Sequence, residues 1–133
     1  MKSVIAQHLT KTYRNGEVRA LDDLSLDVEE GTVLGVLGPN GAGKTTTVRI
    51  LATLLKPDSG SATVAGIDVV KHPDKVRELI GLSGQYAAVD ETLTGWDNLV
   101  MFGRLYHLGK AASIKRADEL LERFSLTDSA RRP

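Results

Sequence analysis

The sequence predicts an α/β fold, and three consecutive features support this prediction. Residues 32–38, TVLGVLG, form the unbroken apolar run that a strand shows when both of its faces are covered. A glycine-rich turn follows at once. Residues 43–55 then place Val48, Leu51, Ala52 and Leu55 at helical spacing. A central strand, a turn and a helix in direct succession are expected here.

The residues before this run predict an antiparallel β region. Polar and apolar residues alternate in short stretches, which predicts strands over 3–9, 17–21 and 24–28. The dipeptide Asn15-Gly16 tolerates positive φ at both central positions of a tight turn. We therefore expect a hairpin in this part of the chain.

The segments after the first helix predict small elements. Residues 61–70 are expected to form a short strand pair around Gly66. Residues 73–80 are expected to form a short helix with Pro73 in its first turn. Residues 82–84 are interpreted as the end of a further strand.

Two helices are predicted in the last third of the chain. Thr94 is expected to cap the first, which runs to about Leu108 and carries apolar residues on more than one side. The second spans 110–124 and has one apolar stripe, formed by Ile114, Ala117, Leu121 and Phe124. A helix that is apolar around much of its circumference is expected to be buried or to meet a partner.

Composition excludes several classes of function. The 17 Lys and Arg residues balance the 17 Asp and Glu residues, so no net field favours nucleic acid, and no nucleic-acid partner is expected. The absence of cysteine excludes disulfides, thiolate zinc sites and a cysteine nucleophile. The first residues lack the apolar core of a signal peptide, and no apolar run reaches the length of a membrane span. A function at a membrane would therefore need a partner.

The glycine-rich turn matches the phosphate-binding pattern G-x-x-x-x-G-K-[ST]. Glycines allow successive backbone N–H groups to converge on a phosphate at the start of a helix, where the helix dipole is positive. Lys44 is expected to contact the β- and γ-phosphates, and the Thr45 hydroxyl is expected to bind Mg²⁺. The predicted nucleotide-binding residues of this loop are Gly38, Pro39, Asn40, Gly41, Ala42, Gly43, Lys44, Thr45 and Thr46.

With these residues in place, the chain resembles the start of an ATP-binding-cassette (ABC) transporter ATPase, a P-loop NTPase. The resemblance runs through essentially the whole chain and is carried first by residues 6–69, AQHLTKTYRNGEVRALDDLSLDVEEGTVLGVLGPNGAGKTTTVRILATLLKPDSGSATVAGIDV. Residues 71–108, KHPDKVRELIGLSGQYAAVDETLTGWDNLVMFGRLYHL, are similar to the daunorubicin-resistance type of drug exporter ATPase. The resemblance implies ATP and Mg²⁺ as ligands.

Two further site residues follow from the resemblance. Tyr13 stands where such cassettes carry the aromatic residue that stacks on adenine; packing at a hairpin end is the alternative. Gln85 stands where the family places a catalytic glutamine that reaches Mg²⁺ and the attacking water; a polar turn residue is the alternative. Residues 87–91, AAVDE, resemble the end of a Walker B strand, but three small apolar residues are too few for a buried strand. Asp90 and Glu91 are therefore expected to be solvated.

The family's signature motif, Walker B carboxylates and switch histidine are expected downstream of residue 133. We therefore expect a fragment of one nucleotide-binding domain, with residues 1–93 in the β region and core and 94–133 beginning the helical subdomain. The isolated chain is expected to bind ATP without hydrolysing it, because the groups that hold Mg²⁺ and orient water are missing.

In complete form the resemblance implies export driven by ATP hydrolysis. It also implies a membrane-spanning permease, a second ATP-binding subunit in a head-to-tail dimer, and a location on the cytoplasmic face of the membrane. The alternatives are a module that only binds nucleotide and a soluble ABC protein without a membrane partner.

Overall fold

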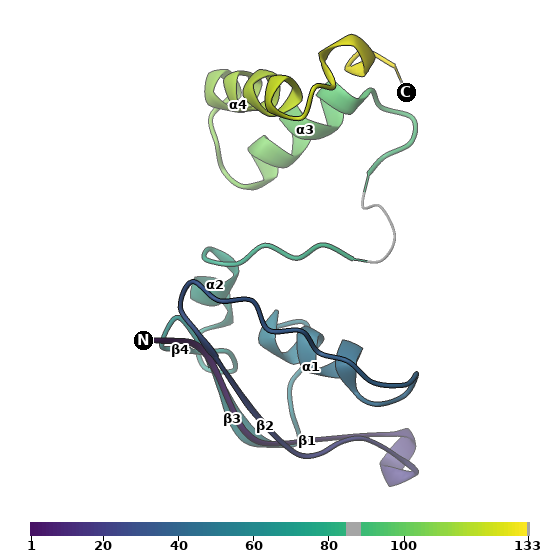
Figure 1. Ribbon diagram of the computed structural model, residues 1–133, viewed down its shortest axis with the longest axis vertical. Coiled ribbons are helices and arrows are strands. Elements are labelled where there is room, and N and C mark those ends of the chain that lie inside the picture. The colour runs from purple at the N-terminus through teal and green to yellow at the C-terminus, as the bar shows by residue number, and fades with distance from the viewer. Residues whose placement is uncertain (85–88, 133) are drawn as a thin grey trace. The chain divides into compact units, whose positions relative to one another are not determined.

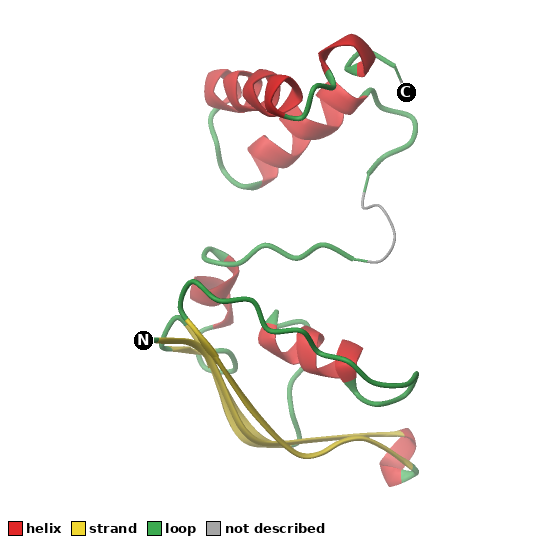
Figure 2. Cartoon of the chain, in the orientation of Figure 1, coloured by secondary structure: helices red, strands yellow, loops and turns green. Residues whose placement is uncertain are grey.

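The structure is a computed structural model that describes residues 1–84 and 89–132. The chain divides into two compact units, Met1–Leu82 and Ser83–Pro133. The first unit contains a β-sheet with two helices, and the second is helical (Figures 1 and 2). Among the described residues, no helix has the length and apolar character needed to cross a bilayer.

The first unit is built on a four-stranded antiparallel sheet in the order β2-β1-β3-β4. Its strands are β1 (Lys2–Tyr13), β2 (Val18–Glu29), β3 (Ser59–Val64) and β4 (Ile67–Asp68). A 3₁₀ turn, η1 (Arg14–Gly16), joins β1 to β2, and Asn15 there has φ of 52°. The expected hairpin and the expected strand pair around Gly66 are both confirmed.

A bulge in β1 changes which side chains face the core. His8 has φ of 52°, and the register shifts there against both β2 and β3. Because of this extra residue, Ala6 and Leu9 both lie buried on the same side. Gly60 of β3 accommodates the bulge: a Cβ on Gly60 would lie 2.3 Å from the His8 carbonyl oxygen. Strand β1 continues to Tyr13, beyond the predicted end at residue 9.

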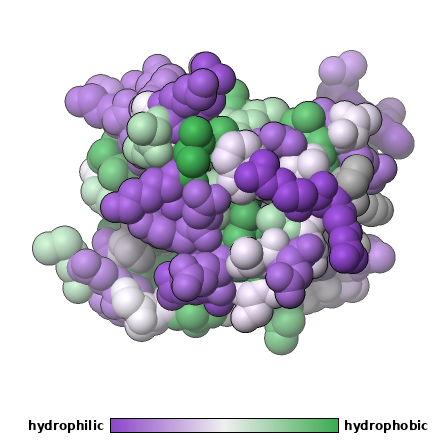
Figure 3. Space-filling model, turned by 90° about the horizontal axis from the view of Figure 1, so that it is seen from above, coloured by the Kyte–Doolittle hydropathy of each residue, from purple (hydrophilic) through white to green (hydrophobic). Residues whose placement is uncertain are grey.

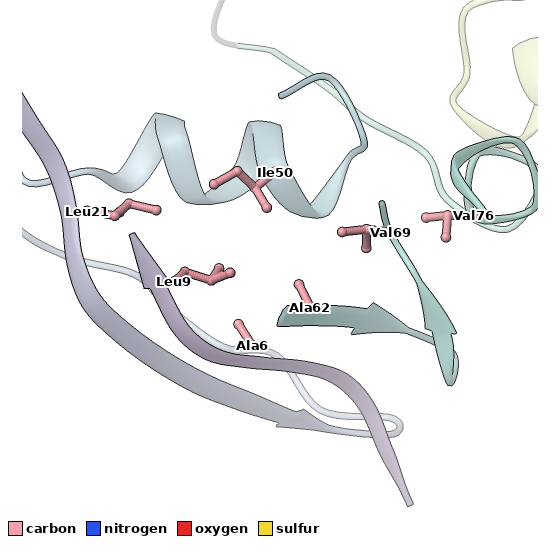
Figure 4. Close-up of a cluster of buried hydrophobic side chains, with 7 residues drawn as sticks. All are labelled: Ala6, Leu9, Leu21, Ile50, Ala62, Val69 and Val76. Carbon is pink, nitrogen blue, oxygen red and sulfur yellow. The ribbon is translucent and has the colours of Figure 1, made fainter. Parts of the chain in front are cut away.

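The core lies between the sheet and α1 (Lys44–Leu51). Figure 4 shows Ile50 of α1 directed toward Leu9 and its neighbours on the strands. Leu9, Ile50 and Val76 of α2 (Pro73–Arg77) have no exposed surface. The cluster is completed by Ala6, Leu21, Ala62 and Val69. Burying these apolar side chains fixes α1 on one face of the sheet.

The prediction of a central strand over 32–38 is wrong for the described structure. This segment has no strand geometry and does not belong to the sheet of β1 to β4. Val33 and Leu37 are 98% and 95% exposed, and Leu34 and Val36 are about half exposed. A strand with two apolar faces needs strands beside it and layers on both sides, and residues 1–84 and 89–132 supply neither.

Two other boundaries differ from the expectations. Helix α1 ends at Leu51 instead of residue 55, because the chain turns left-handed at Thr53, with φ of 62°. The Thr53 and Leu54 N–H groups then donate to the carbonyls of Ile50 and Arg49, closing the helix end. Residues 82–84 are not a strand, and α2 is shorter than the predicted helix over 73–80.

The second unit contains α3 (Gly95–Leu105), α4 (Lys110–Arg123) and a 3₁₀ turn, η2 (Thr127–Ser129). The predicted cap is confirmed, since the Thr94 hydroxyl accepts a hydrogen bond from the Asp97 N–H. Helices α3 and α4 approach so closely at Gly103 that a Cβ there would lie 2.9 Å from the Ser113 side chain.

The apolar stripe of α4 is only partly buried. Ala117 and Leu121 are buried as expected, whereas Phe124 is 67% exposed because it lies at the helix end. The face drawn in Figure 3 shows hydrophobic residues interspersed with hydrophilic ones. Trp96 is held at one end of this unit by a hydrogen bond to Asp118 and by the Arg131 guanidinium 4.5 Å from its ring centroid.

Candidate nucleotide-binding site

The glycine-rich loop folds back on the lysine that follows it. The Lys44 ammonium donates to the carbonyl oxygens of Gly38, at 2.6 Å, and Pro39, at 2.7 Å. Within the loop, the Ala42 N–H donates to the Pro39 carbonyl at 3.2 Å. The loop is thus a closed turn with a cation bonded across it. A phosphate group would offer the same ammonium stronger, charged acceptors.

Gly43 is the junction between this loop and α1. It has φ of 85° and forms the N-cap of the helix. A Cβ at this position would lie 2.4 Å from the Ala20 carbonyl oxygen and 2.6 Å from Leu21 Cδ2. Only glycine satisfies both the left-handed conformation and the close approach to β2. The sheet therefore sets where the helix begins.

The first turn of α1 presents donor groups toward the loop. The first intrahelical bond runs from the Thr47 N–H to the Gly43 carbonyl, so the N–H groups of Lys44, Thr45 and Thr46 precede it. These amides, with the positive end of the helix dipole, suit an anion. Thr45 is exposed, whereas Thr46 is buried. The loop and helix therefore have the donors that a polyphosphate needs.

Tyr13 lies at the end of β1, on the same side of the sheet as α1. Its hydroxyl is 3.4 Å from the Thr46 hydroxyl. The side chain is 36% exposed, so it is covered on the side of Thr46 and open elsewhere. The structure thus brings Tyr13 to the first turn of α1, next to the glycine-rich loop.

A polar group that the sequence analysis did not single out lies beside Tyr13. The Asp58 carboxylate accepts hydrogen bonds from Lys11 Nζ at 2.6 Å, the Thr12 N–H at 2.7 Å and the Thr12 hydroxyl at 2.9 Å. The Lys11 bond and then the Thr12 bonds lower the pKa of Asp58 from 3.8 to about 2. The sequence offers no local signal for this contact, because Asp58 and Thr12 are 46 positions apart.

Gln85 falls outside the described residues, so its predicted role stays a prediction. The turn beyond it, in the second unit, is held by Asn98, a buried side chain of α3. Asn98 accepts from the Asp90 N–H at 2.8 Å and donates to the Asp90 carbonyl at 2.9 Å. Asp90 and Glu91 are exposed, as expected, and the Thr92 hydroxyl and N–H lower the pKa of Asp90.

The described residues near the loop offer a metal ion few oxygen ligands of their own. Over residues 1–84 and 89–132, no cluster of three or more His, Asp or Glu side chains could hold a metal ion. Thr45 supplies one exposed hydroxyl oxygen beside the loop. Mg²⁺ commonly binds through one or two protein oxygens together with phosphate oxygens and waters, and this arrangement fits that mode.

Comparison with known proteins agrees with this geometry. A sequence model of the ABC transporter family matches residues 21–133. A daunorubicin resistance ATP-binding protein of Streptomyces coeruleorubidus is 62% identical over 98% of this chain, which covers 40% of that protein. A doxorubicin resistance ATP-binding protein of Mycobacterium tuberculosis is 55% identical over 98% of this chain and 39% of its own length.

Solved structures show the same fold. An ATP-binding subunit of an ABC transporter superposes with a TM-score of 0.79 and 25% identity, covering 96% of this chain and 52% of that one. A dimeric ATP-binding cassette in a post-hydrolysis state, bound to ADP and Pi, gives a TM-score of 0.80 and 28% identity over 96% of this chain and 60% of that one. This chain thus spans only part of each of these relatives.

Proposed function

This chain belongs to the ABC transporter family, and from that membership we propose that it binds ATP as part of the ATP-binding component of a drug exporter. The observation that supports this most is the closed loop of residues 38–43 with the Lys44 ammonium bonded across it at the start of α1. Its donors have the chemistry and placement that a triphosphate requires.

Three residues at the start of α1 have distinct roles in this proposal. Lys44 exchanges its bonds to Gly38 and Pro39 for bonds to the β- and γ-phosphates. The Thr45 and Thr46 N–H groups donate to phosphate oxygens, and the Thr45 hydroxyl provides a ligand for Mg²⁺. When bound, Mg²⁺ would neutralise phosphate charge. Lys44 and Gln85 are the proposed catalytic residues, and Thr45 and Gln85 are the proposed ligands of Mg²⁺.

Tyr13 provides the platform for the adenine base. It is 36% exposed, so part of its surface is accessible. An open cavity of ≈ 640 Å³ is lined by Tyr13, Asn15, Leu55 and Asp58 among other residues. Stacking on an aromatic ring contributes about 1 to 3 kcal/mol per base in single-stranded nucleic-acid complexes.

Export, partners and location are proposed from the relatives. Two relatives are named for resistance to daunorubicin or doxorubicin, which supports a drug-like substrate for the complete protein. A membrane-spanning permease would carry that substrate, and a second ATP-binding subunit would complete a dimer like that of the ADP-bound cassette. The protein would then lie peripherally on the cytoplasmic face of the membrane.

Calorimetric titration of the 133-residue chain with Mg-ATP tests the proposal. Lys44→Ala is expected to weaken ATP binding about tenfold or more, because a hydrogen bond to a charged group contributes about 1.5 to 3 kcal/mol. Tyr13→Ala is expected to weaken it about fivefold or more, through lost stacking. Lys75→Ala, which removes an exposed lysine of α2, is the matched control and should bind normally.

Unchanged ATP affinity in both Lys44→Ala and Tyr13→Ala would contradict this site assignment. The same samples test the expectation that the isolated chain has no ATPase activity above background. Phosphate release that disappears in Lys44→Ala would show that expectation to be wrong.

A further inference from the structure

The connection between α1 and β3 carries a carboxylate that reaches back to the end of β1. Asp58 Oδ1 accepts from Lys11 Nζ, while Oδ2 accepts from both the N–H and the hydroxyl of Thr12. The backbone of Asp58 also contacts β1, because the Asp58 N–H donates a hydrogen bond to the Thr10 carbonyl at 2.9 Å. One residue thus holds three consecutive residues of β1.

These contacts occur where the sheet holds β1 least regularly. The register of β1 against β2 shifts between Leu9 and Lys11 and again between Lys11 and Thr12. Pairing of β1 with β3 ends at Thr10. Past this point β1 has a neighbouring strand on one side only, and its backbone is held on the other side by the Asp58 carboxylate.

Tyr13 is the next residue along the chain, so the orientation of its ring depends on the backbone of Thr12. The Thr12 N–H donates to Asp58 Oδ2 at 2.7 Å, and this backbone hydrogen bond, on the edge of β1 away from β2, immediately precedes Tyr13. Lys11 is largely buried, with 16% of its side chain exposed, and balances the charge of Asp58. Two charge-assisted bonds shorter than 2.8 Å indicate a firmly held carboxylate.

We propose that Asp58 is a positioning residue for nucleobase recognition, which holds the end of β1 so that the Tyr13 ring keeps its place beside the phosphate loop. This inference rests on the proposed function. It assigns Asp58 no contact with the phosphates. Asp58 therefore contributes to binding of the base and leaves binding of the triphosphate unaffected.

Comparing ATP with inorganic tripolyphosphate, both as Mg²⁺ complexes, separates positioning from general stabilisation. In Asp58→Ala we expect ATP affinity to fall about two- to fivefold, which is no more than the loss in Tyr13→Ala, because the ring is misplaced and not removed. Tripolyphosphate affinity should be unchanged. Asp58→Asn keeps an acceptor for Thr12 and should restore most of the ATP affinity. Asp74→Ala, which removes an exposed carboxylate paired with Arg77, is the matched control.

A double-mutant cycle completes the test. In a Tyr13→Ala background, Asp58→Ala should have no further effect on ATP affinity, because the ring that it positions is gone. An equal loss in both backgrounds, equal weakening of ATP and tripolyphosphate, or an Asp58→Asn variant as weak as Asp58→Ala would overturn the inference. If ATP binding depends on Lys44 and Tyr13 but not on Asp58, the inference about Asp58 is wrong and the proposed function stands. If the unmodified chain does not bind ATP, the proposed function is wrong as well.

Discussion

Two stretches of the first unit differ in whether they join the sheet. Strand β1 is interrupted by polar residues, yet it pairs with β2 and β3 and buries Ala6 and Leu9. Residues 32–38 are apolar almost throughout, yet they remain outside the sheet with Val33 and Leu37 almost fully exposed.

The difference shows that neighbours, more than composition, decide whether a stretch becomes a strand. Backbone donors and acceptors of a strand need a ladder on each side, and β1 finds one in β2 and in β3. For 32–38 the described residues offer no such ladder. An exposed apolar stretch of this kind is an association hazard.

Truncating one leucine in each stretch is expected to give the largest difference in stability. Leu9→Ala is expected to lower the free energy of unfolding by about 2 to 5 kcal/mol, because Leu9 is fully buried. Leu37→Ala is expected to change it by less than about 0.5 kcal/mol. Urea unfolding followed by far-UV circular dichroism measures both, and equal losses would show that 32–38 is packed in solution.

The point where the exposed stretch rejoins the packed unit gives the next largest effect. Gly43→Ala is expected to cost about 2 to 4 kcal/mol, because its Cβ would meet the Ala20 carbonyl in a left-handed conformation. Gly41→Ala is the matched control: it has a similar φ of 87° but nothing within 4 Å of its Cβ, so only the backbone strain of about 1 kcal/mol is expected. The same unfolding titration separates them, and indistinguishable variants would contradict the close packing.

The smallest expected effect on stability comes from the hydrogen bonds that Asp58 accepts from Lys11 and Thr12 at the end of β1. Because the pKa of Asp58 is lowered from 3.8 to about 2, its ionised form stabilises the fold above about pH 4, and this contribution is lost as the pH falls toward 2. Asp58→Asn should therefore unfold at a lower urea concentration than the unmodified chain near neutral pH, and the gap should close on acidification to about pH 2. A gap independent of pH would contradict this assignment.

Local patterns predicted several elements in both units. Alternation and the Asn15-Gly16 turn identified the hairpin, and Thr94 identified the start of α3. Alternation failed at His8, because a bulge changes the phase of a strand without any marker residue. The prediction of a strand over 32–38 failed for a different reason, since an apolar pattern does not say whether other strands are present to pair with it.

The part of the candidate site formed by consecutive residues was predictable from the sequence, and the part formed by residues far apart in the chain was not. The spacing of Gly38, Gly43, Lys44 and Thr45 is a backbone requirement, so the motif alone located the loop. Tyr13 came only from family resemblance. The partners of Asp58 lie on another strand, and no periodicity links them to it.

The carbonyl contacts of Lys44 have a consequence for ligand discrimination. The Lys44 ammonium already donates to two carbonyl oxygens of its own chain, so a ligand that binds this ammonium must first replace these two hydrogen bonds. A neutral compound offers hydrogen-bond acceptors no stronger than these carbonyl oxygens, whereas a polyanion offers charged acceptors that bind the ammonium more strongly. A ligand that binds Lys44 must therefore offer acceptors stronger than these two carbonyl oxygens, and charged phosphate oxygens are such acceptors.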